Sequence, residues 1–531
     1  MNDTYSLAKW FSFIFFAALL FVNPLGARSA EAKAGKIKRP NIILIVTDNQ
    51  SERLLGAYGN THIKTPHIDQ LAAEGSLVAN AFAASGVCSP TRAALLTGLM
   101  PSQTGIHVAL PPVVDLENWS AIEEFRNLPS ALSAAGYVTG LVGKYHLGNH
   151  YKPQIGFDHW VTFHGGHTTT FWDQEVVDNG ETYRMQGHLT DFWTDKAIEF
   201  VRDQTDKKPF FLMLAYNGPY MLPPTVLMEP RGKHAAYYSK NIPPMPQTPI
   251  HPYLESWARG KGPTGQMVKD GTTAWRAIRA LNNPIAMINT AAEMSLLDDG
   301  IGRLVASLKA QGLDEDTLIV FTSDQGSSYG QHGLWGNTSW SFPFAAYNMN
   351  MRVPLIVRYP RLIAAGQTTD RIVNQVDIFP TILDYANVAD KNIPNSSGKS
   401  IVSILEGKNT DWDDVAFFEF VTVRVIETPK WKYSKSYHDD VTAELYDLEA
   451  DPEELNNLIA VSEHTKIIEQ LDQQLDAYFT KYSDSKYDLW RGGTAKAQLL
   501  GNHYGKDYIF SDRFPDWKTP KVEKLSPYVE K

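Results

Sequence analysis

The hydrophobic pattern of the chain is dominated by two apolar, β-branched stretches that each end in a carboxylate. They run from Pro40 to Asp48 and from Thr317 to Asp324. Stretches of this kind are typical of strands buried on both faces of a parallel sheet. Further strands are predicted at 138–142 and 210–215, and helices at 71–74, 191–202 and 291–311. This alternation predicts an α/β fold with a large doubly wound, mostly parallel sheet flanked by helices.

The two aspartates stand at equivalent ends of their predicted strands. Doubly wound sheets bind ligands beyond the carboxyl ends of their strands. Asp48 and Asp324 are therefore both expected at the ligand-binding edge. For either residue alone, capping of the next helix is an equally simple explanation.

A change of pattern near residue 413 predicts a second, smaller unit. Short strands are expected at 415–425, at 431–436 and around Tyr446, followed by a helix at 462–482. We therefore divide the chain into a signal peptide (1–30), a catalytic α/β domain (38–412) and a C-terminal subdomain with its tail (413–531). The subdomain is expected to be a small antiparallel sheet with a helix packed on it.

Residues 222–285 are rich in Pro, Gly, Lys and aromatic residues. Two interpretations remain open, an excursion over the mouth of the active site and a disordered insertion. Under the first, substrate contacts are expected from this segment, from 150–170, and from the C-terminal strands near Arg424 and His438.

The N-terminus has the layout of a signal peptide. Lys9 precedes an apolar stretch from Trp10 to Val22, which is followed by Pro24 and small residues. That stretch is too short for a comfortable membrane span. Cleavage after Ala27 or within 30–32 fits equally, and an uncleaved anchor is the alternative. No second apolar segment could span a bilayer, so we expect a periplasmic or secreted protein without stable membrane insertion.

Charge and cysteine content narrow the functional classes. The chain carries 49 Lys and Arg against 59 Asp and Glu, a net charge of −10, and no basic block. This argues against nucleic acid as a partner. Cys88 is the only cysteine, so it cannot form the internal disulfides that exported proteins often carry. It therefore has another purpose, or none.

Cys88 begins a C-x-P-x-R pattern that Pro90 and Arg92 complete. This pattern strongly resembles the active-site signature of type I sulfatases, the formylglycine-dependent family of the alkaline phosphatase superfamily. The resemblance extends over nearly the whole mature chain. It includes the opening strand at 40–48, TPHIDQLA at 65–72, GKYHLG at 143–148, SDQG to HGLW at 323–335, and LYDL to NNL at 445–458.

The resemblance implies a specific chemistry for residue 88. Cys88 would be oxidised by a formylglycine-generating enzyme, and its hydrated aldehyde would attack sulfate esters. Pro90 at an early helical position would set residue 88 near a helix N-terminus, where anions are favoured. Arg92 would hold the hydrate, Lys144 would bind sulfate, and His146 would orient the nucleophile. This chemistry requires residue 88 to open onto a cavity.

The same comparison implies one calcium ion per chain. Its ligands would come from two strand ends and the modified residue, namely Asp48, Asn49, Cys88, Asp324 and Gln325. Oxygen donors of this kind suit a hard cation. Zinc is disfavoured because the chain has no Cys/His cluster.

Four positions depart from the family pattern. Asn49 and Gln325 replace a second carboxylate and an Asn or His, which should weaken calcium binding. Tyr220 stands where the family has a histidine, and Asn337 where it has a lysine. Two missing cations remove about 2–4 kcal/mol of transition-state stabilisation each.

Replacement groups are therefore needed if the protein is active. The candidates are His107, His164, His167, His332 and Tyr220. We place His107 and His167 with Cys88, Arg92, Lys144 and His146 among the catalytic residues. Substrate binding is assigned to Lys144, Tyr220, His332 and Asn337.

The sequence thus predicts an exported sulfatase that hydrolyses sulfate esters of a carbohydrate or polysaccharide. Two alternatives stay open. One is a phosphate or phosphonate ester hydrolase of the same superfamily, and the other is a catalytically weak, sulfatase-like glycan-binding protein, which the replacements at Tyr220 and Asn337 motivate.

Overall fold

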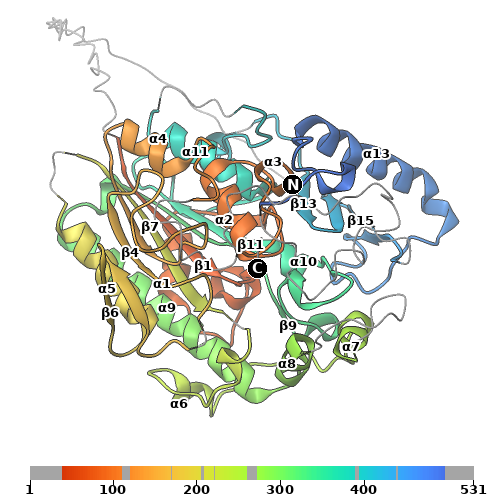
Figure 1. Ribbon diagram of the computed structural model, residues 1–531, viewed down its shortest axis with the longest axis horizontal. Helices are drawn as coiled ribbons and strands as arrows, with labels where there is room; N and C mark the ends of the chain where they lie inside the picture. The colour runs from red at the N-terminus through yellow and green to blue at the C-terminus, as the bar shows by residue number, and fades with distance from the viewer. Residues whose placement is uncertain are drawn as a thin grey trace, which may run out of the picture. The chain divides into compact units, whose positions relative to one another are not determined.

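A ten-stranded mixed sheet forms the centre of the protein (Figure 1). The computed structural model describes residues 39–110, 120–168, 170–204, 208–220, 222–259, 272–388, 394–408, 410–437 and 441–496. The strands lie in the order β12-β2-β11-β8-β1-β7-β3-β4-β5-β6. Their bounds are β1 Asn41–Asp48, β2 Ser76–Phe82, β3 Val138–Gly143, β4 His159–Phe163, β5 Glu175–Asp178, β6 Glu181–Arg184, β7 Phe210–Pro219, β8 Thr317–Ser323, β11 Arg352–Arg358 and β12 Gln367–Asn374.

The middle of this sheet is parallel. Strand β1 lies between β7 and β8, and all eight of its residues are buried. Antiparallel strands appear outside this centre, where β11 separates β8 from β2 and where β5 and β6 form one edge. The predicted α/β class is confirmed, with a mixed sheet around the parallel centre. Because Thr47 pairs with Ser323, the chain leaves β1 and β8 at the same edge.

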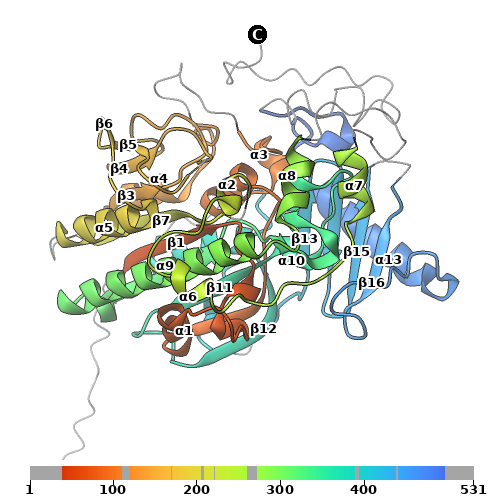
Figure 2. The ribbon, with the colours of Figure 1, turned by 90° about the horizontal axis from the view of Figure 1, so that it is seen from below.

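Helices cover both faces of the sheet, as Figures 1 and 2 show. Helices α1 (Pro66–Ala73), α5 (Leu189–Arg202) and α9 (Pro284–Ala310) pack against one another on one face. Helices α2 (Cys88–Thr97), α4 (Leu128–Ala134) and α11 (Ile378–Tyr385) pack together on the other. The short helices α3 (Pro101–Thr104), α10 (Asn348–Met351) and α12 (Val402–Leu405) lie in the connections between longer elements.

Helix α9 begins earlier than the predicted span of 291–311. The side chain of Asn283 accepts a hydrogen bond from the backbone N–H of Ile285, and Pro284 occupies the first turn. An Asn cap followed by Pro is a strong start signal that the apolar periodicity alone does not reveal.

A four-stranded antiparallel sheet follows the large one along the chain. Its strands are β13 Ala416–Phe420, β14 Val423–Glu427, β15 Trp431–Ser436 and β16 Glu444–Asp447, and helix α13 (Thr465–Tyr482) packs on β14 and β15. The expected stretch 415–425 divides into two strands because the chain turns at Val421, which has a positive φ of 47°. Leu471, Leu475 and Phe479 bury the inner face of α13 at helical spacing.

The described part of the 222–285 segment consists of short helices. They are the 3₁₀ turn η3 (Thr225–Leu227), α6 (Ala235–Tyr238), α7 (Pro252–Ala258) and α8 (Thr272–Ala280). Both η3 and α6 pack on α9, and α8 lies against β10 (Trp335–Gly336), which pairs with β9 (Ser328–Tyr329).

Two of the sequence-based expectations concern residues that the structure does not describe. They are the signal peptide and His438. Among the residues that the structure describes, no helix is both long and apolar enough to cross a bilayer.

Candidate active site

The carboxyl ends of β1 and β8 bring Asp48 and Asp324 together. The backbone N–H of Asn49 donates to Asp324 Oδ1 at 3.1 Å, and the N–H of Asp324 donates to Thr47 O at 3.0 Å. Asn49 has a positive φ of 59°, a conformation that asparagine tolerates better than most residues, so the chain turns sharply after the strand. The expectation that both acids reach one edge is therefore met by direct hydrogen bonding between the two strand ends.

Cys88 is the first residue of helix α2 and faces this acidic edge. Its Sγ lies 3.6 Å from Asp48 Oδ1 and 3.4 Å from Gln325 Nε2. The thiol is completely buried, and burial together with the charge of Asp48 raises the pKa of Cys88 to about 12. Because the thiolate is the nucleophilic form of cysteine, an unmodified Cys88 is inert at neutral pH.

Two buried cations neutralise the two acids. Lys144 Nζ lies 2.5 Å from Asp48 Oδ2, while Nε and Nη2 of Arg92 donate to Asp324 Oδ2 at 3.0 and 2.8 Å. All four side chains are 0% exposed. Burial alone would lower the pKa of Lys144, but Asp48, Cys88 and Asp324 together outweigh it and raise the pKa, so the ammonium stays charged. The site thus holds a balanced group of two negative and two positive charges.

The donor set fits a hard cation. Ligand atoms of Asp48, Cys88 and Asp324 all lie within 4.8 Å of one another. Burial, and next the facing charge of Asp324, raise the pKa of Asp48 to about 6, while the neighbouring Lys144 and Arg92 act in the opposite direction. The neighbouring amides of Asn49 and Gln325 are joined by a 2.5 Å hydrogen bond, and Asn49 Nδ2 has no partner among the described residues. Carboxylate and amide oxygens in this arrangement suit Ca²⁺.

His146 and His167 form a second group beside the charges. Their ring centroids are 4.7 Å apart. Burial is the main reason that the pKa of His146 falls well below its usual value and that of His167 falls to about 3, so both rings are neutral. His146 Nε2 lies 3.0 Å from the carbonyl of Leu110 and therefore donates to it, which leaves Nδ1 as an acceptor without a partner among the described residues. Gly166 permits this position, because a Cβ there would lie 1.8 Å from His146 Cδ2.

Tyr220 and Asn337, the two departures from the family pattern, also reach the cluster. The Tyr220 N–H donates to Asp48 O at 3.1 Å, and Lys144 Nζ lies 5.6 Å from the centre of its ring. Its hydroxyl is 3.1 Å from His167 Nδ1. Asn337 Nδ2 donates to Asn49 Oδ1 at 2.8 Å. Both replacements therefore lie beside the expected metal ligands.

The structure places three of the candidate histidines elsewhere. His107 is buried, and its Nε2 lies 2.9 Å from the carbonyl of Tyr487 in the C-terminal segment. His332 stacks on Tyr347 with ring centroids 3.8 Å apart. His164 stacks with His150 at 4.2 Å. His107 and His332 thus have packing contacts outside the charged cluster, and their predicted catalytic and substrate-binding roles stay predictions.

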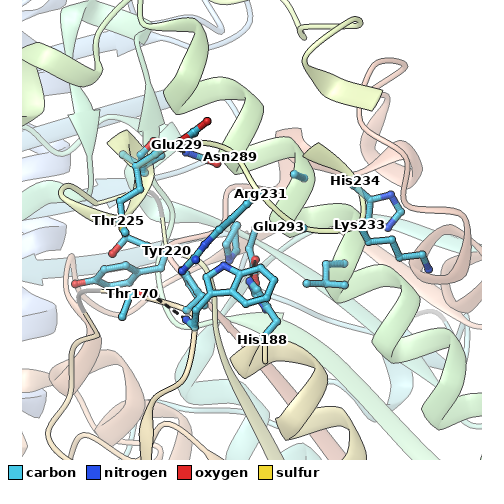
Figure 3. A pocket seen from close by; sticks show the side chains of 18 residues that line it. Thr170, His188, Tyr220, Thr225, Glu229, Arg231, Lys233, His234, Asn289 and Glu293 are labelled. Carbon is cyan, nitrogen blue, oxygen red and sulfur yellow. Dashed lines mark hydrogen bonds and ion pairs between the residues drawn. The ribbon is translucent and has the colours of Figure 1, made fainter. Parts of the chain in front are cut away.

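Cys88 does not open directly onto a cavity in this structure, which corrects the sequence-based expectation. Its side chain is 0% exposed, and so is that of Lys144. Tyr220, which is 7% exposed, contacts the buried cluster and also lines a surface pocket together with Pro219 (Figure 3).

Some residues of this region gave no signal in the sequence. Gln375 donates from Nε2 to the carbonyls of Ser323 and Asp324 at 2.8 and 2.6 Å, and so holds the end of β8 in place. Gly166 is required only because His146 packs against it. Neither role follows from a local pattern, since each depends on a contact between distant parts of the chain.

Comparison with known proteins agrees with this geometry. Residues 40–388 match the sulfatase family model, and residues 336–481 match the model for the C-terminal region of N-sulphoglucosamine sulphohydrolase. The chain therefore belongs to the sulfatase family, within the alkaline phosphatase superfamily, and is a sulfuric ester hydrolase.

Individual relatives are similar over most of their length. An N-acetylglucosamine-6-O-sulfatase of Bacteroides thetaiotaomicron is 29% identical, over 88% of this chain and 91% of the relative. An N-acetylgalactosamine-6-sulfatase of Rattus norvegicus is 27% identical, over 67% of this chain and 63% of the relative. A solved structure of a protein with its substrate D-glucosamine-2-N,6-O-disulfate is 28% identical, with a TM-score of 0.69 over 85% of this chain and 99% of that one.

Proposed function

We propose that this protein is an exported sulfatase that removes sulfate esters from a carbohydrate, using formylglycine at position 88 and one calcium ion. The observation that carries the proposal is the buried cluster itself. An inert thiol, two acids and two cations from four separate segments share one point at the end of the sheet. A thiol that stays protonated at neutral pH cannot act as a nucleophile in this cluster. The charges of the cluster instead fit an anionic substrate bound at a metal ion.

Formylglycine at position 88 and the calcium ion would each contribute a different catalytic function. When Cys88 is converted to formylglycine, its hydrate supplies a nucleophilic oxygen, and bound Ca²⁺ supplies Lewis-acid stabilisation of a sulfate oxygen. The ion would be held by Asp48, Asn49, Asp324 and Gln325. Calcium would also release Lys144 and Arg92 from full pairing with the acids, so that their charges could face the sulfate.

His146, Tyr220 and His167 would provide the proton acceptor and the hydrogen-bond donors of the reaction. Since Nε2 of His146 donates to Leu110, its Nδ1 is a base that can accept a proton. The pKa of Tyr220 is raised well above its usual value by burial and by the charge of Asp48, so the phenol stays protonated and donates to His167 Nδ1. His167 then carries its proton on Nε2, from which the neutral ring can donate a hydrogen bond to a leaving oxygen. Tyr220 and His167 together would replace the usual histidine.

The proposed substrate is a 6-O-sulfated hexosamine within a glycan. Two of the similar curated proteins are named as 6-sulfatases of N-acetylated hexosamines, and the similar solved structure holds a 6-O-sulfated glucosamine. Export is proposed from the apolar stretch 10–22 at the N-terminus.

The decisive experiment joins mass spectrometry with turnover. The protein is expressed with and without a formylglycine-generating enzyme, the peptide containing residue 88 is weighed, and sulfate release is measured on N-acetylglucosamine-6-sulfate. We expect turnover to rise in proportion to the converted fraction, and Cys88→Ala to abolish it. Full activity of a preparation that holds only unmodified thiol would refute the proposal.

Two outcomes of the same assay would favour the alternatives. Among the described residues, Asp48, Cys88 and Asp324 form the one cluster suited to a metal, whereas phosphate ester hydrolases of this superfamily often use zinc with additional His and Asp ligands. Faster release from an aryl phosphate than from an aryl sulfate would nevertheless establish the hydrolase of phosphate esters. Absence of turnover on a broad panel of sulfated sugars, with residue 88 fully converted, would support the non-catalytic glycan-binding protein.

A further inference from the structure

Tyr220, whose hydroxyl contacts His167 beside the charged cluster, also lines a surface pocket (Figure 3). The space between its walls, open solvent included, is about 630 Å³. The walls come from the loop before β5, the start of α5, the end of β7, the segment 225–234 and the middle of α9. Pro219 of the wall pairs with Asp48 in the sheet, so the pocket and the charged cluster share one strand end. A group bound here would therefore lie next to a substrate at residue 88.

Arg231 lines the pocket and forms no ion pair with a carboxylate among the described residues, although Glu229 belongs to the same wall. Arg231 is exposed, and its guanidinium lies 4.6 Å from the centre of the Trp172 ring, which holds it by a cation–π contact. The other cations of the wall are different, because Lys233 and His234 both contact Asp299 Oδ2 at 2.6 Å. Arg231 is thus left available for an anion from solution.

The floor of the pocket offers buried polar groups. Glu293 is buried, accepts a hydrogen bond from Thr190 Oγ1 at 2.5 Å, and lies 3.3 Å from His188 Nε2. Burial raises the pKa of Glu293 to about 7 and lowers that of His188 to about 4. The His188 ring is therefore neutral at neutral pH, and Glu293 is divided between its protonated and ionised forms. Groups of this kind can form hydrogen bonds with sugar hydroxyls.

The wall that carries Arg231 is fixed to the core of the fold. Asn289 of α9 donates from Nδ2 to the carbonyls of Val226 and Met228 at 2.9 and 2.8 Å. These bonds hold the segment just before Arg231 against the helix. The position of the cation is therefore set before any ligand arrives, which lowers the entropic cost of binding.

We propose that this pocket is a subsite for the sugar residue next to the one that carries the cleaved sulfate, and that Arg231 binds an anionic group on that residue. The inference rests on the proposed function, since it presumes a glycan substrate at residue 88. The planar guanidinium matches the two oxygens of a carboxylate or of a second sulfate. The protein carries a net charge of −10, so an unpaired arginine on its surface gives local selectivity for an anion. Trp172 is a positioning residue that acts through Arg231.

Measurements of binding affinity test this proposal independently of catalysis. The Cys88→Ala variant is used, because it can bind substrate without turnover. Calorimetry gives its Kd for a 6-sulfated monosaccharide and for three disaccharides, whose neighbouring sugar is a uronic acid, a sulfated sugar or a neutral sugar. Arg231→Gln is expected to raise the Kd of the two anionic disaccharides about tenfold, the loss of one charge-assisted hydrogen bond, and to leave the other two ligands unchanged. Comparison of the two anionic ligands shows whether carboxylate or sulfate is preferred.

Matched variants test the role of each group. Lys240→Gln removes the same charge from an exposed position of the same segment outside the pocket, and is expected to have no effect. Trp172→Ala should reproduce part of the loss, and Trp172→Phe should restore it, because a ring of either kind can hold the guanidinium. Arg231→Gln at an exposed site should leave the melting temperature unchanged.

The results distinguish the two proposals. If Arg231→Gln weakens the neutral disaccharide as much as the anionic ones, or weakens none, the subsite is refuted even if the wild-type enzyme releases sulfate. If no sulfate ester is hydrolysed but Arg231 still governs the binding of anionic disaccharides, the glycan-binding pocket at Arg231 stands and the proposed function fails.

Discussion

Replacement of Lys144 by methionine gives the sharpest test of the charge balance in the site. Lys144→Met keeps the length of the side chain and leaves Asp48 without its cation. The two groups are 0% exposed and 2.5 Å apart. At an effective dielectric constant of 20 their Coulomb attraction is about 7 kcal/mol, which is an upper bound on what the pair contributes. Removing one partner of a buried pair usually costs about 3–5 kcal/mol, because a charge is left buried and uncompensated.

Calcium should reduce this cost. Bound Ca²⁺ would take over the neutralisation of Asp48, so the destabilisation should be large in EGTA and much smaller with excess calcium. For a folded chain of this length the entropy of unfolding is about 1 kcal/mol/K, so the loss corresponds to a fall of roughly 3–5 °C in melting temperature. Calorimetry or intrinsic fluorescence of the unmodified protein, with and without calcium, gives both values.

A double variant provides the control for this prediction. Asp48→Asn removes the acid instead, and Lys144→Met with Asp48→Asn removes both charges. The double variant should lose less stability than the two single losses added together, because neither charge remains unpaired. Strict additivity, or a Lys144→Met loss that calcium does not reduce, would show that the buried ion pair and the metal site are not linked as argued.

Three further predictions address the metal, the histidine and the pocket floor. Chelation with EGTA should abolish sulfate release and lower the melting temperature, with recovery on adding Ca²⁺ but not Zn²⁺; activity that persists in EGTA would exclude calcium. Gly166→Ala should lower kcat about 100-fold, because the new Cβ would displace His146, and an unchanged kcat would remove that histidine from catalysis. Glu293 is protonated more readily in the folded state than its usual pKa of 4.5 allows, so wild-type protein should lose up to roughly 3 kcal/mol of stability as the pH rises from 4.5 through about 7. Glu293→Gln should flatten this dependence, and a variant with the wild-type pH profile of melting temperature would contradict the assignment.

The sequence alone determined the central strands and the residues at their ends. The stretches that end at Asp48 and Asp324 are continuously apolar, and only burial on both faces of a sheet accommodates such runs. Strand β3 at Val138–Gly143 and strand β15 at Trp431–Ser436 also lie where their patterns predicted them. Periodicity is a local property, so it identifies elements and the ends from which functional side chains project.

Only the tertiary structure decided which of those side chains meet. The sequence ranked His107 and His167 alike, but the fold directs His107 to the carbonyl of Tyr487, 380 positions along the chain, and His167 to Tyr220. The tertiary structure also determines that Cys88 is buried, because the residues that cover it come from separate segments that no single motif contains. Arg231 is one exposed arginine among many in the sequence. It becomes a candidate ligand site only because Trp172, from a distant loop, lies beneath it. Such contacts depend on how distant segments pack against one another, and that packing is set by the whole folded chain rather than by any stretch of it.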